Sequence, residues 1–158
     1  MPPPGTAPSA ADPAAPKGCS SLKLRQLSRR VSQLFDAEVS SAGLKTTQYS
    51  LLSHVVRLGP VRPGQLAAVM EMDASTLTRN LQPLLTQGWV QVGPGDDGRS
   101  HQVEVTPAGR AMHAQARKAW QRAQQSFNAR MGTERVARLH AVIDECLAQL
   151  HEPEAPEP

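Results

Sequence analysis

Residues 73–106 read DASTLTRNLQPLLTQGWVQVGPGDDGRSHQVEVT, and this stretch decides the expected fold. In its first half, leucines follow Leu77 at the spacing of one buried face of an amphipathic helix. Asp73 or Ser75 can cap this helix by accepting hydrogen bonds from its free N–H groups. In the second half, apolar and polar residues alternate on both sides of a Gly- and Asp-rich turn. The stretch therefore predicts a helix followed directly by a β-hairpin.

Apolar residues at helical spacing predict five further helices around this unit. The expected ranges are 20–40, 46–58, 63–70, 107–131 and 133–150. Pro63 and Pro107 suit the first turn of a helix, where the missing N–H does no harm. The predicted fold class is mainly α with a small β-hairpin wing, in which a winged helix-turn-helix is joined to a helical dimerisation domain.

Some positions within these elements carry their own expectation. Thr46 or Thr47 is expected to cap the second helix. Val69 is expected to face the interior, and Cys146, within an apolar stripe, to be a core residue. The period of two in the hairpin places four valines on one face, namely Val90, Val92, Val103 and Val105.

Composition divides the chain into one domain and two tails. Residues 1–17 and 151–158 are rich in proline and poor in large apolar side chains, so we expect disordered tails there. Residues 18–150 form the domain, with 44–106 as its winged helix-turn-helix. The helices of 18–43 and 107–150 are longer than that unit needs. Their apolar faces require a partner, and a second copy of the chain supplies one most simply.

The charge balance indicates what kind of partner the protein binds, and the cysteine content indicates the cell compartment in which it works. Residues 18–150 hold 16 basic and 10 acidic side chains, and this surplus favours a polyanionic partner. Cys19 and Cys146 form no disulfide framework, and the N-terminus has no signal-peptide pattern. No run approaches the roughly 18 apolar residues of a membrane helix. These features predict a cytoplasmic protein that does not act at a membrane.

The sequence offers no pattern typical of catalysis. The histidines are scattered, without cysteine or carboxylate at ligand spacing, so no metal site is expected. We find no nucleophile elbow, phosphate-binding loop or carboxylate pair. The prediction is a protein that is not an enzyme and requires no cofactor.

Three segments carry a recognisable pattern, namely QLAAVMEMDASTLTRNLQPLLTQGWV, the wing DDGRS and VEVTPAGR. In these segments, and over residues 20–150 as a whole, the chain resembles the MarR family of bacterial transcriptional regulators. A D-x-R-S wing followed by T-x-x-G-R at this spacing is specific. The resemblance implies a homodimer that binds a pseudo-palindromic operator in double-stranded DNA. It also implies a repressor released by a small phenolic or aromatic acid, or by oxidation.

Residues for contact with DNA follow from this resemblance and from the chemistry of the grooves. Hydroxyls, Gln and Arg on an exposed helix can reach base edges and phosphates. The expected set on the helix and hairpin is Ser75, Thr76, Thr78, Arg79, Gln82, Asp97 and Arg99. Arg79 is expected to contact a guanine, and Arg99 to enter the minor groove in a rotamer held by Asp97. Arg62 is a candidate phosphate contact. The alternative is a solvated helix face and an exposed turn arginine.

Ligand and redox sites are also candidates. Arg25 and Ser28 border the apolar stripe of the first helix and could pair with a carboxylate, while Tyr49 could stack on an aromatic ring. Arg25 is equally well explained as a surface cation or a DNA-backbone contact. Cys19 is a candidate oxidation sensor if nearby lysines stabilise its thiolate, although a lone cysteine is more often incidental. A winged-helix protein–protein adaptor without a DNA target is the alternative from another functional class.

Overall fold

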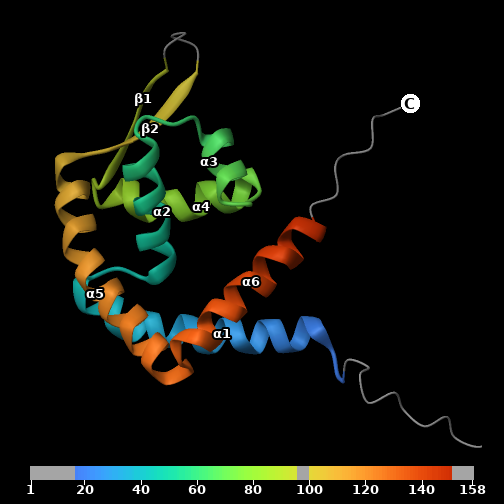
Figure 1. The fold of residues 1–158 in the computed structure, drawn as a ribbon. Helices are drawn as coiled ribbons and strands as arrows, with labels where there is room; N and C mark the ends of the chain where they lie inside the picture. The colour runs from blue at the N-terminus through green and yellow to red at the C-terminus, as the bar shows by residue number, and fades with distance from the viewer. Residues whose placement is uncertain (1–16, 96–99, 151–158) are drawn as a thin grey trace, which may run out of the picture.

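The computed structural model of the protein describes residues 17–95 and 100–150 (Figure 1). In chain order the elements are α1 (Ser20–Val39), the 3-10 helix η1 (Ser40–Ala42), α2 (Thr46–Leu58), α3 (Pro63–Val69), α4 (Ala74–Thr86), β1 (Val90–Pro94), β2 (His101–Val105), α5 (Pro107–Met131) and α6 (Thr133–Leu150). This order confirms the predicted fold class. The two expected tails lie outside the described residues, apart from Lys17. No helix within the described ranges has the length and apolar character needed to span a bilayer.

The elements form two parts that α5 connects (Figure 1). One part gathers α2, α3, α4 and the hairpin, and we call it the reading head. The other contains α1, α6 and the far end of α5, and we call it the stem (Figure 1). Because α5 runs from the hairpin to the stem, any movement of the head relative to the stem must act on α5 or on the α1–α2 connection.

The core of the reading head is aliphatic and joins all of its elements. Its most deeply buried side chains are Leu51, Leu52, Val55, Leu66, Leu77, Leu84, Val90 and Val103. The strands β1 and β2 are antiparallel, with Val90 opposite Val105 and Val92 opposite Val103. Val61 adds a bridge on the other side of Val103, through two backbone hydrogen bonds of 3.0 and 2.8 Å. This bridge fixes the start of α3 to the hairpin.

The beginning of α5 is locked to the turn between α4 and β1. Thr106 caps α5, and its Oγ1 accepts a hydrogen bond from the Gly109 N–H at 3.0 Å. The same hydroxyl donates to the Gly88 carbonyl at 2.6 Å, and the Thr106 N–H donates to the Trp89 carbonyl at 3.1 Å. A Cβ added at Gly109 would overlap the Trp89 carbonyl oxygen. The T-x-x-G part of the sequence pattern is therefore a cap followed by a close backbone approach.

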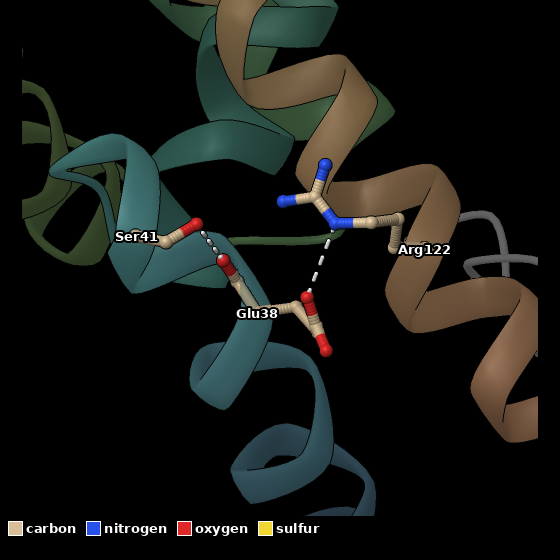
Figure 2. A network of polar contacts seen from close by, with 3 residues as sticks. All are labelled: Glu38, Ser41 and Arg122. Atoms are coloured by element: carbon tan, nitrogen blue, oxygen red, sulfur yellow. Dashed lines mark hydrogen bonds and ion pairs between the residues drawn. The ribbon is translucent and has the colours of Figure 1, made fainter.

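Polar contacts join α1 to α5 and α2 within and beside the stem. Figure 2 shows Glu38 of α1 paired with Arg122 of α5 through a 3.3 Å contact between Oε2 and Nε, and the Ser41 hydroxyl donating to the Glu38 carbonyl at 2.6 Å. Both ends of this ion pair are exposed, so it contributes at most about 1 kcal/mol. On the other side, Asp36 Oδ1 accepts a hydrogen bond from the Thr46 N–H at 2.7 Å. Asp36 thus ties the end of α1 to the start of α2.

Three expectations from the sequence are wrong. The N-cap of α2 is Lys45, and neither threonine occupies that position. Side chains of other residues satisfy the N–H groups at this helix start, because Gln48 Oε1 accepts from the Lys45 N–H at 2.8 Å and Asp36 Oδ1 from the Thr46 N–H at 2.7 Å. Val69 is 46% exposed, because the seven-residue α3 turns only Leu66 and Ala67 to the core. Cys146 is exposed, because α6 buries only its first turn against the rest of the chain.

Apolar side chains remain exposed on the stem of the single chain. They lie near the N-terminus of α1 and along α6, namely Leu22, Leu24, Val142, Ile143, Leu147 and Leu150. On α6 they recur at helical spacing, so they form one face of that helix. In the hairpin, Val92 shares the inner face with Val90 but is 50% exposed, since it lies farther from the body of the core.

Candidate functional site

The first turn of α4 is organised by Asp73. Its Oδ1 accepts hydrogen bonds from the Thr76 N–H at 2.7 Å and from the Ser75 hydroxyl at 2.6 Å. Its Oδ2 accepts from the Thr76 hydroxyl at 2.7 Å. Hydrogen bonds from Ser75 and then Thr76 hold the pKa of Asp73 far below its usual range. Asp73 is therefore the N-cap that the sequence predicts, and it stays ionised at neutral pH.

This cap limits what the hydroxyls of α4 offer to a partner. A hydroxyl has one proton, and those of Ser75 and Thr76 are donated to Asp73. Thr78 donates its proton to the Ala74 carbonyl at 2.8 Å. A phosphate accepts hydrogen bonds but cannot donate them, so these hydroxyls must reorient before they can bind one. The expected role of the three residues in contacting DNA stays a prediction.

Arg79 and Gln82 are the exposed donors one turn further along α4. Among the described residues, the Arg79 guanidinium is held only by a 3.3 Å hydrogen bond from Nη2 to Thr76 Oγ1, so most of its donors remain for another partner. Both side chains lie on the face of α4 opposite Leu77 and Leu84, which are buried in the core. The helix therefore presents a guanidinium and an amide to solvent, as its sequence predicts.

The remaining expected contact residues are Arg62, Asp97 and Arg99. Asp97 and Arg99 are outside the described residues. On either side of this gap, the Gly95 N–H donates a hydrogen bond to the Ser100 carbonyl at 2.7 Å. Arg62 is the exposed N-cap of α3 and follows Val61, the residue bridged to β2. Arg62 is thus held near the hairpin, on the same part of the reading head as α4.

Two cavities lie against α4, and Arg79 lines both of them. The larger, about 700 Å³, extends from Arg79 along the C-terminal half of α4 to Trp89 and to Met112 at the start of α5. The smaller, about 180 Å³, lies between α4 and the start of α2 and includes Lys45. Gln48 also lines both. Sequence reasoning missed Lys45 and Gln48, because only folding brings the α2 start beside α4.

A further groove, which we call the junction groove, begins between α1, α2 and α5, where the stem meets the reading head, and continues between α1, α5 and α6 within the stem. It consists of two cavities of about 500 and 490 Å³ that share Val31, Ser32, Phe35 and Gln124. Tyr49 lines the first and Ser28 the second, so these two candidate residues lie along one groove.

Arg25 stands apart from this junction groove. It lines neither cavity, and its Nη2 donates to Ser21 Oγ at 2.9 Å. The described residues that line the groove include no Lys, Arg, Asp or Glu. Histidines, hydroxyls and an amide therefore supply its polar groups.

Aromatic side chains form a continuous row beside this groove. His113 stacks on Tyr49 with ring centres 5.4 Å apart and planes 7° from parallel. Tyr49 then contacts Trp120 at 6.1 Å, Trp120 contacts Phe35 at 6.3 Å, and Phe35 contacts Phe127 at 6.2 Å. Such tilted pairs are favourable beyond the area that they bury. The row couples α2 of the reading head to α1 and α5 of the stem.

The tautomer of His113 follows from its hydrogen bonds. Ser53 donates its proton to the Tyr49 carbonyl at 2.8 Å, so its Oγ can only accept from His113 Nε2, 3.1 Å away. Nδ1 of the neutral imidazole is then unprotonated. Burial, and secondly the positive charge of Arg117, lower the pKa of His113 from its ordinary value. The neutral ring is therefore the form that this junction favours.

Both cysteines are exposed in the single chain. Cys19 is the N-cap residue of α1 and forms no side-chain cap there. Its expected role as an oxidation sensor stays a prediction. In residues 17–95 and 100–150, no three His, Cys, Asp or Glu side chains gather at a spacing that would hold a metal ion.

Comparison with known proteins shows which family has this architecture. A model of the MarR family matches residues 42–100. The transcriptional regulator MosR of M. tuberculosis, solved in complex with DNA, is 31% identical with a TM-score of 0.71, over 85% of this chain and all of that one. The chain belongs to the MarR family. The segment that the family model matches covers α2, α3, α4 and β1. The MosR structure covers 85% of this chain, so its similarity extends beyond this segment into the helices on both sides.

One further solved structure and two curated sequences are similar to this MarR-family chain. A probable transcriptional regulator from Pseudomonas aeruginosa is 26% identical with a TM-score of 0.74, covering 80% of this chain and 96% of that one. The multiple antibiotic resistance protein MarR of Salmonella typhimurium is 30% identical over 87 residues, which are 54% of this chain and 60% of that protein. The alignment with the Bacillus subtilis regulator YwoH covers 61% of YwoH. The chain thus matches about 60% of the length of these curated relatives.

Proposed function

We propose that this MarR-family chain is a sequence-specific, DNA-binding regulator of transcription. The observation that carries the proposal is the exposed face of α4, where Arg79 and Gln82 keep their donors available beside a hairpin wing. An α-helix fits the major groove, and Arg and Gln are side chains that read guanine and adenine edges there. MosR, which shares this fold, was solved in complex with DNA.

Each candidate contact has a role in the proposed complex. Arg79 reads a guanine, while Gln82 and Thr78 contact neighbouring bases. Ser75 and Thr76 reach the phosphates once their hydroxyls leave Asp73. Arg62 contacts a phosphate from the start of α3. In the wing, Arg99 enters the minor groove and Asp97 orients it.

The proposed complex contains two copies of the chain. The exposed apolar face of α6 and the apolar start of α1 together are the kind of surface that a soluble chain covers by association. Two copies related by a two-fold axis would present two α4 helices to successive major grooves of a pseudo-palindromic operator.

Regulation in this proposal is repression that a small aromatic or phenolic ligand relieves. The junction groove has the features of a small-molecule site, since aromatic side chains line it and a few polar groups border them. Tyr49 lies in the groove and in the aromatic row, so a ligand there would act on α2 and α5 together. A ligand that prefers one head–stem arrangement would change the spacing of the two α4 helices.

Binding to a duplex from the region upstream of the chain's own gene tests the proposal. Fluorescence anisotropy is expected to show affinity that falls steeply between about 50 and 200 mM salt, and that exceeds affinity for a shuffled duplex. Arg79→Ala should weaken specific binding by ~1–3 kcal/mol, which is roughly fivefold to 160-fold. Arg30→Ala removes the same charge from α1 and is the matched control.

Two results would contradict the proposal. Absence of binding to both duplexes would favour the adaptor alternative, and equal affinity for both would exclude sequence-specific recognition. Equal losses from Arg79→Ala and Arg30→Ala would remove α4 from the interface, because the two variants differ only in where the guanidinium is lost.

A further inference from the structure

Hydrogen bonds join three side chains of α4 and its cap in a series. Thr76 donates its hydroxyl proton to Asp73 Oδ2 at 2.7 Å, and the Thr76 Oγ1 accepts a hydrogen bond from Arg79 Nη2 at 3.3 Å. The three residues are spaced three apart, so their side chains are neighbours along one side of the helix. We call this series of Asp73, Thr76 and Arg79 the α4 network.

The direction of the two hydrogen bonds follows from the groups that form them. The Asp73 carboxylate is ionised at neutral pH and can only accept, so the single hydroxyl proton of Thr76 points toward it. The lone pairs of Thr76 Oγ1 are then left to accept, and an arginine can only donate. A hydroxyl that donates to a charged group also becomes a stronger acceptor. Asp73 therefore acts on Arg79 through Thr76.

The other threonines within α4 behave differently. Thr78 and Thr86 each donate to the backbone carbonyl four residues earlier, at 2.8 and 2.9 Å. That is a common hydrogen bond for a threonine inside a helix, and it spends the proton on the helix itself. Thr76 differs because Asp73 supplies an acceptor outside the helix backbone. The cap is therefore the feature that makes Thr76 a support for Arg79.

The α2 side of Arg79 offers it no comparable support. Arg79 and Lys45 line the same small cavity, whose described lining includes no Asp or Glu. Among the described residues, Thr76 is the one hydrogen-bond partner of the Arg79 guanidinium. The rotamer freedom that an arginine loses on binding weakens binding by about threefold to tenfold. A partner that already holds the guanidinium in the free protein removes part of this loss.

We infer that Asp73 and Thr76 are positioning residues, which hold Arg79 in place to read a guanine and so raise the specificity of α4 at that base pair. Thr76 accepts only one of the five guanidinium N–H groups, so a bidentate contact to guanine remains available. The inference rests on the proposed function. For Thr76 it competes with the phosphate contact, because one hydroxyl proton cannot serve both Asp73 and a phosphate.

Four variants separate the members of the α4 network. Thr76→Val keeps the branched shape without the hydroxyl, and Thr76→Ser keeps the hydroxyl. Asp73→Asn keeps an oxygen for the cap, but its amide nitrogen cannot accept the Thr76 proton. Thr86→Val is the matched control, since it removes a hydroxyl of the same helix that donates to the Gln82 carbonyl.

Guanines in the upstream duplex provide the readout. Each protein is titrated by fluorescence anisotropy with this duplex and with copies in which one guanine is 7-deazaguanine, which lacks the N7 acceptor that arginine uses. The guanine read by Arg79 is the one whose replacement weakens wild-type binding but not binding by Arg79→Ala. The ratio of the two Kd values at that guanine measures discrimination. If no guanine meets this criterion, Arg79 reads none and the inference is overturned.

Thr76→Val and Asp73→Asn are each expected to lower this ratio at least about threefold, because Arg79 loses its support. The charge that Asp73→Asn removes affects every duplex alike and cancels in the ratio. Thr76→Ser and Thr86→Val should leave the ratio unchanged. Combining Thr76→Val with Asp73→Asn should lower it no further than either variant alone, since both break one network.

Two results of these titrations would overturn the inference. Equal weakening of every duplex by Thr76→Val, at an unchanged ratio, would identify a phosphate contact instead. A ratio lowered equally by Thr76→Ser and Thr76→Val would show that the shape of the side chain matters and its hydroxyl does not. If Thr76→Val fails to fold, Asp73→Asn carries the same measurement.

Arginine side-chain NMR tests the α4 network in the protein without DNA. The Arg79 Nε–Hε resonance is identified by its loss in Arg79→Ala, and its order parameter should fall in Thr76→Val and Asp73→Asn but not in Thr86→Val. An unchanged order parameter would overturn the network whether or not the protein binds DNA. A fall in the order parameter without binding to any duplex would refute the proposed function and leave the network standing. The two failures are therefore distinguishable.

Discussion

Replacing Gly109 with alanine tests the junction that holds α5 to the reading head. A Cβ at this position would overlap the Trp89 carbonyl oxygen and lie 2.8 Å from the Trp89 carbonyl carbon and 2.9 Å from Val105 Cγ2. An ordinary contact of 3.4 Å to that carbon alone would require α5 to retreat by roughly 0.6 Å, and clearing the Trp89 carbonyl oxygen, which the Cβ overlaps more deeply, requires a larger movement. Because the obstacle is backbone, a change of rotamer cannot relieve it.

The expected cost follows from the contacts that such a retreat disturbs. Overpacking of a well-packed site costs about 1–3 kcal/mol. The retreat also strains the hydrogen bonds of Thr106 to Gly88, Trp89 and Gly109, and losing one costs a further ~1 kcal/mol. The higher helix propensity of alanine offsets up to about 1 kcal/mol. We expect Gly109→Ala to lower the free energy of unfolding by roughly 2–3 kcal/mol, and Tm by about 5–10 °C.

Urea unfolding followed by circular dichroism measures this cost, at one protein concentration so that association contributes equally to each variant. Gly64→Ala is the matched control. Gly64 lies in α3, its added Cβ would meet no atom within 4 Å, and the substitution should stabilise by ~0.4–1 kcal/mol. A Gly109→Ala protein within about 0.5 kcal/mol of wild type, at an unchanged m-value, would refute the close-packing argument.

Three further substitutions test other contacts. Asp73→Ala should destabilise the protein at pH 7, while Asp73→Asn keeps most of the cap. Because folding lowers the pKa of Asp73, the stability that its carboxylate contributes is fully present above pH 3.8 and is lost as the pH falls below that value. Urea midpoints measured at pH 7 and below pH 3.8 would show this loss. Wild-type stability should fall as pH drops below about 6.5, since the unfolded chain then binds the proton that folding keeps off His113, and His113→Gln should flatten that slope in thermal melts. Arg99→Ala should weaken operator binding at least about tenfold with an unchanged dimer in sedimentation; unchanged affinity would exclude the wing contact.

The sequence predicts the elements well, because each has a local cause. Leucine spacing places α4, the Thr106-Pro107 pair places the start of α5, and alternating valines place the strands. The wrong positions depend on partners distant in sequence. Cys146 is exposed because little of the chain reaches α6, and Val69 is exposed because α3 is too short to bury a second turn.

The candidate site divides in the same way. Arg79 and Gln82 could be named from the sequence, because a helix with one apolar stripe must present its other side outward. Lys45 and Gln48 could not, since no local pattern shows that the start of α2 packs beside α4. The sequence also placed Arg25 with Ser28 and Tyr49, whereas the fold turns Arg25 back onto Ser21.

The sequence by itself determined the fold class, the order of elements and the exposed face of α4. Hydrophobic periodicity and capping act within a few residues, so they are readable without a structure. Tertiary structure alone decided which cavities contain a cation, how Asp73 occupies the hydroxyls of Ser75 and Thr76, and why Gly109 has no room for a side chain. Those properties depend on distances between distant segments, which only packing fixes.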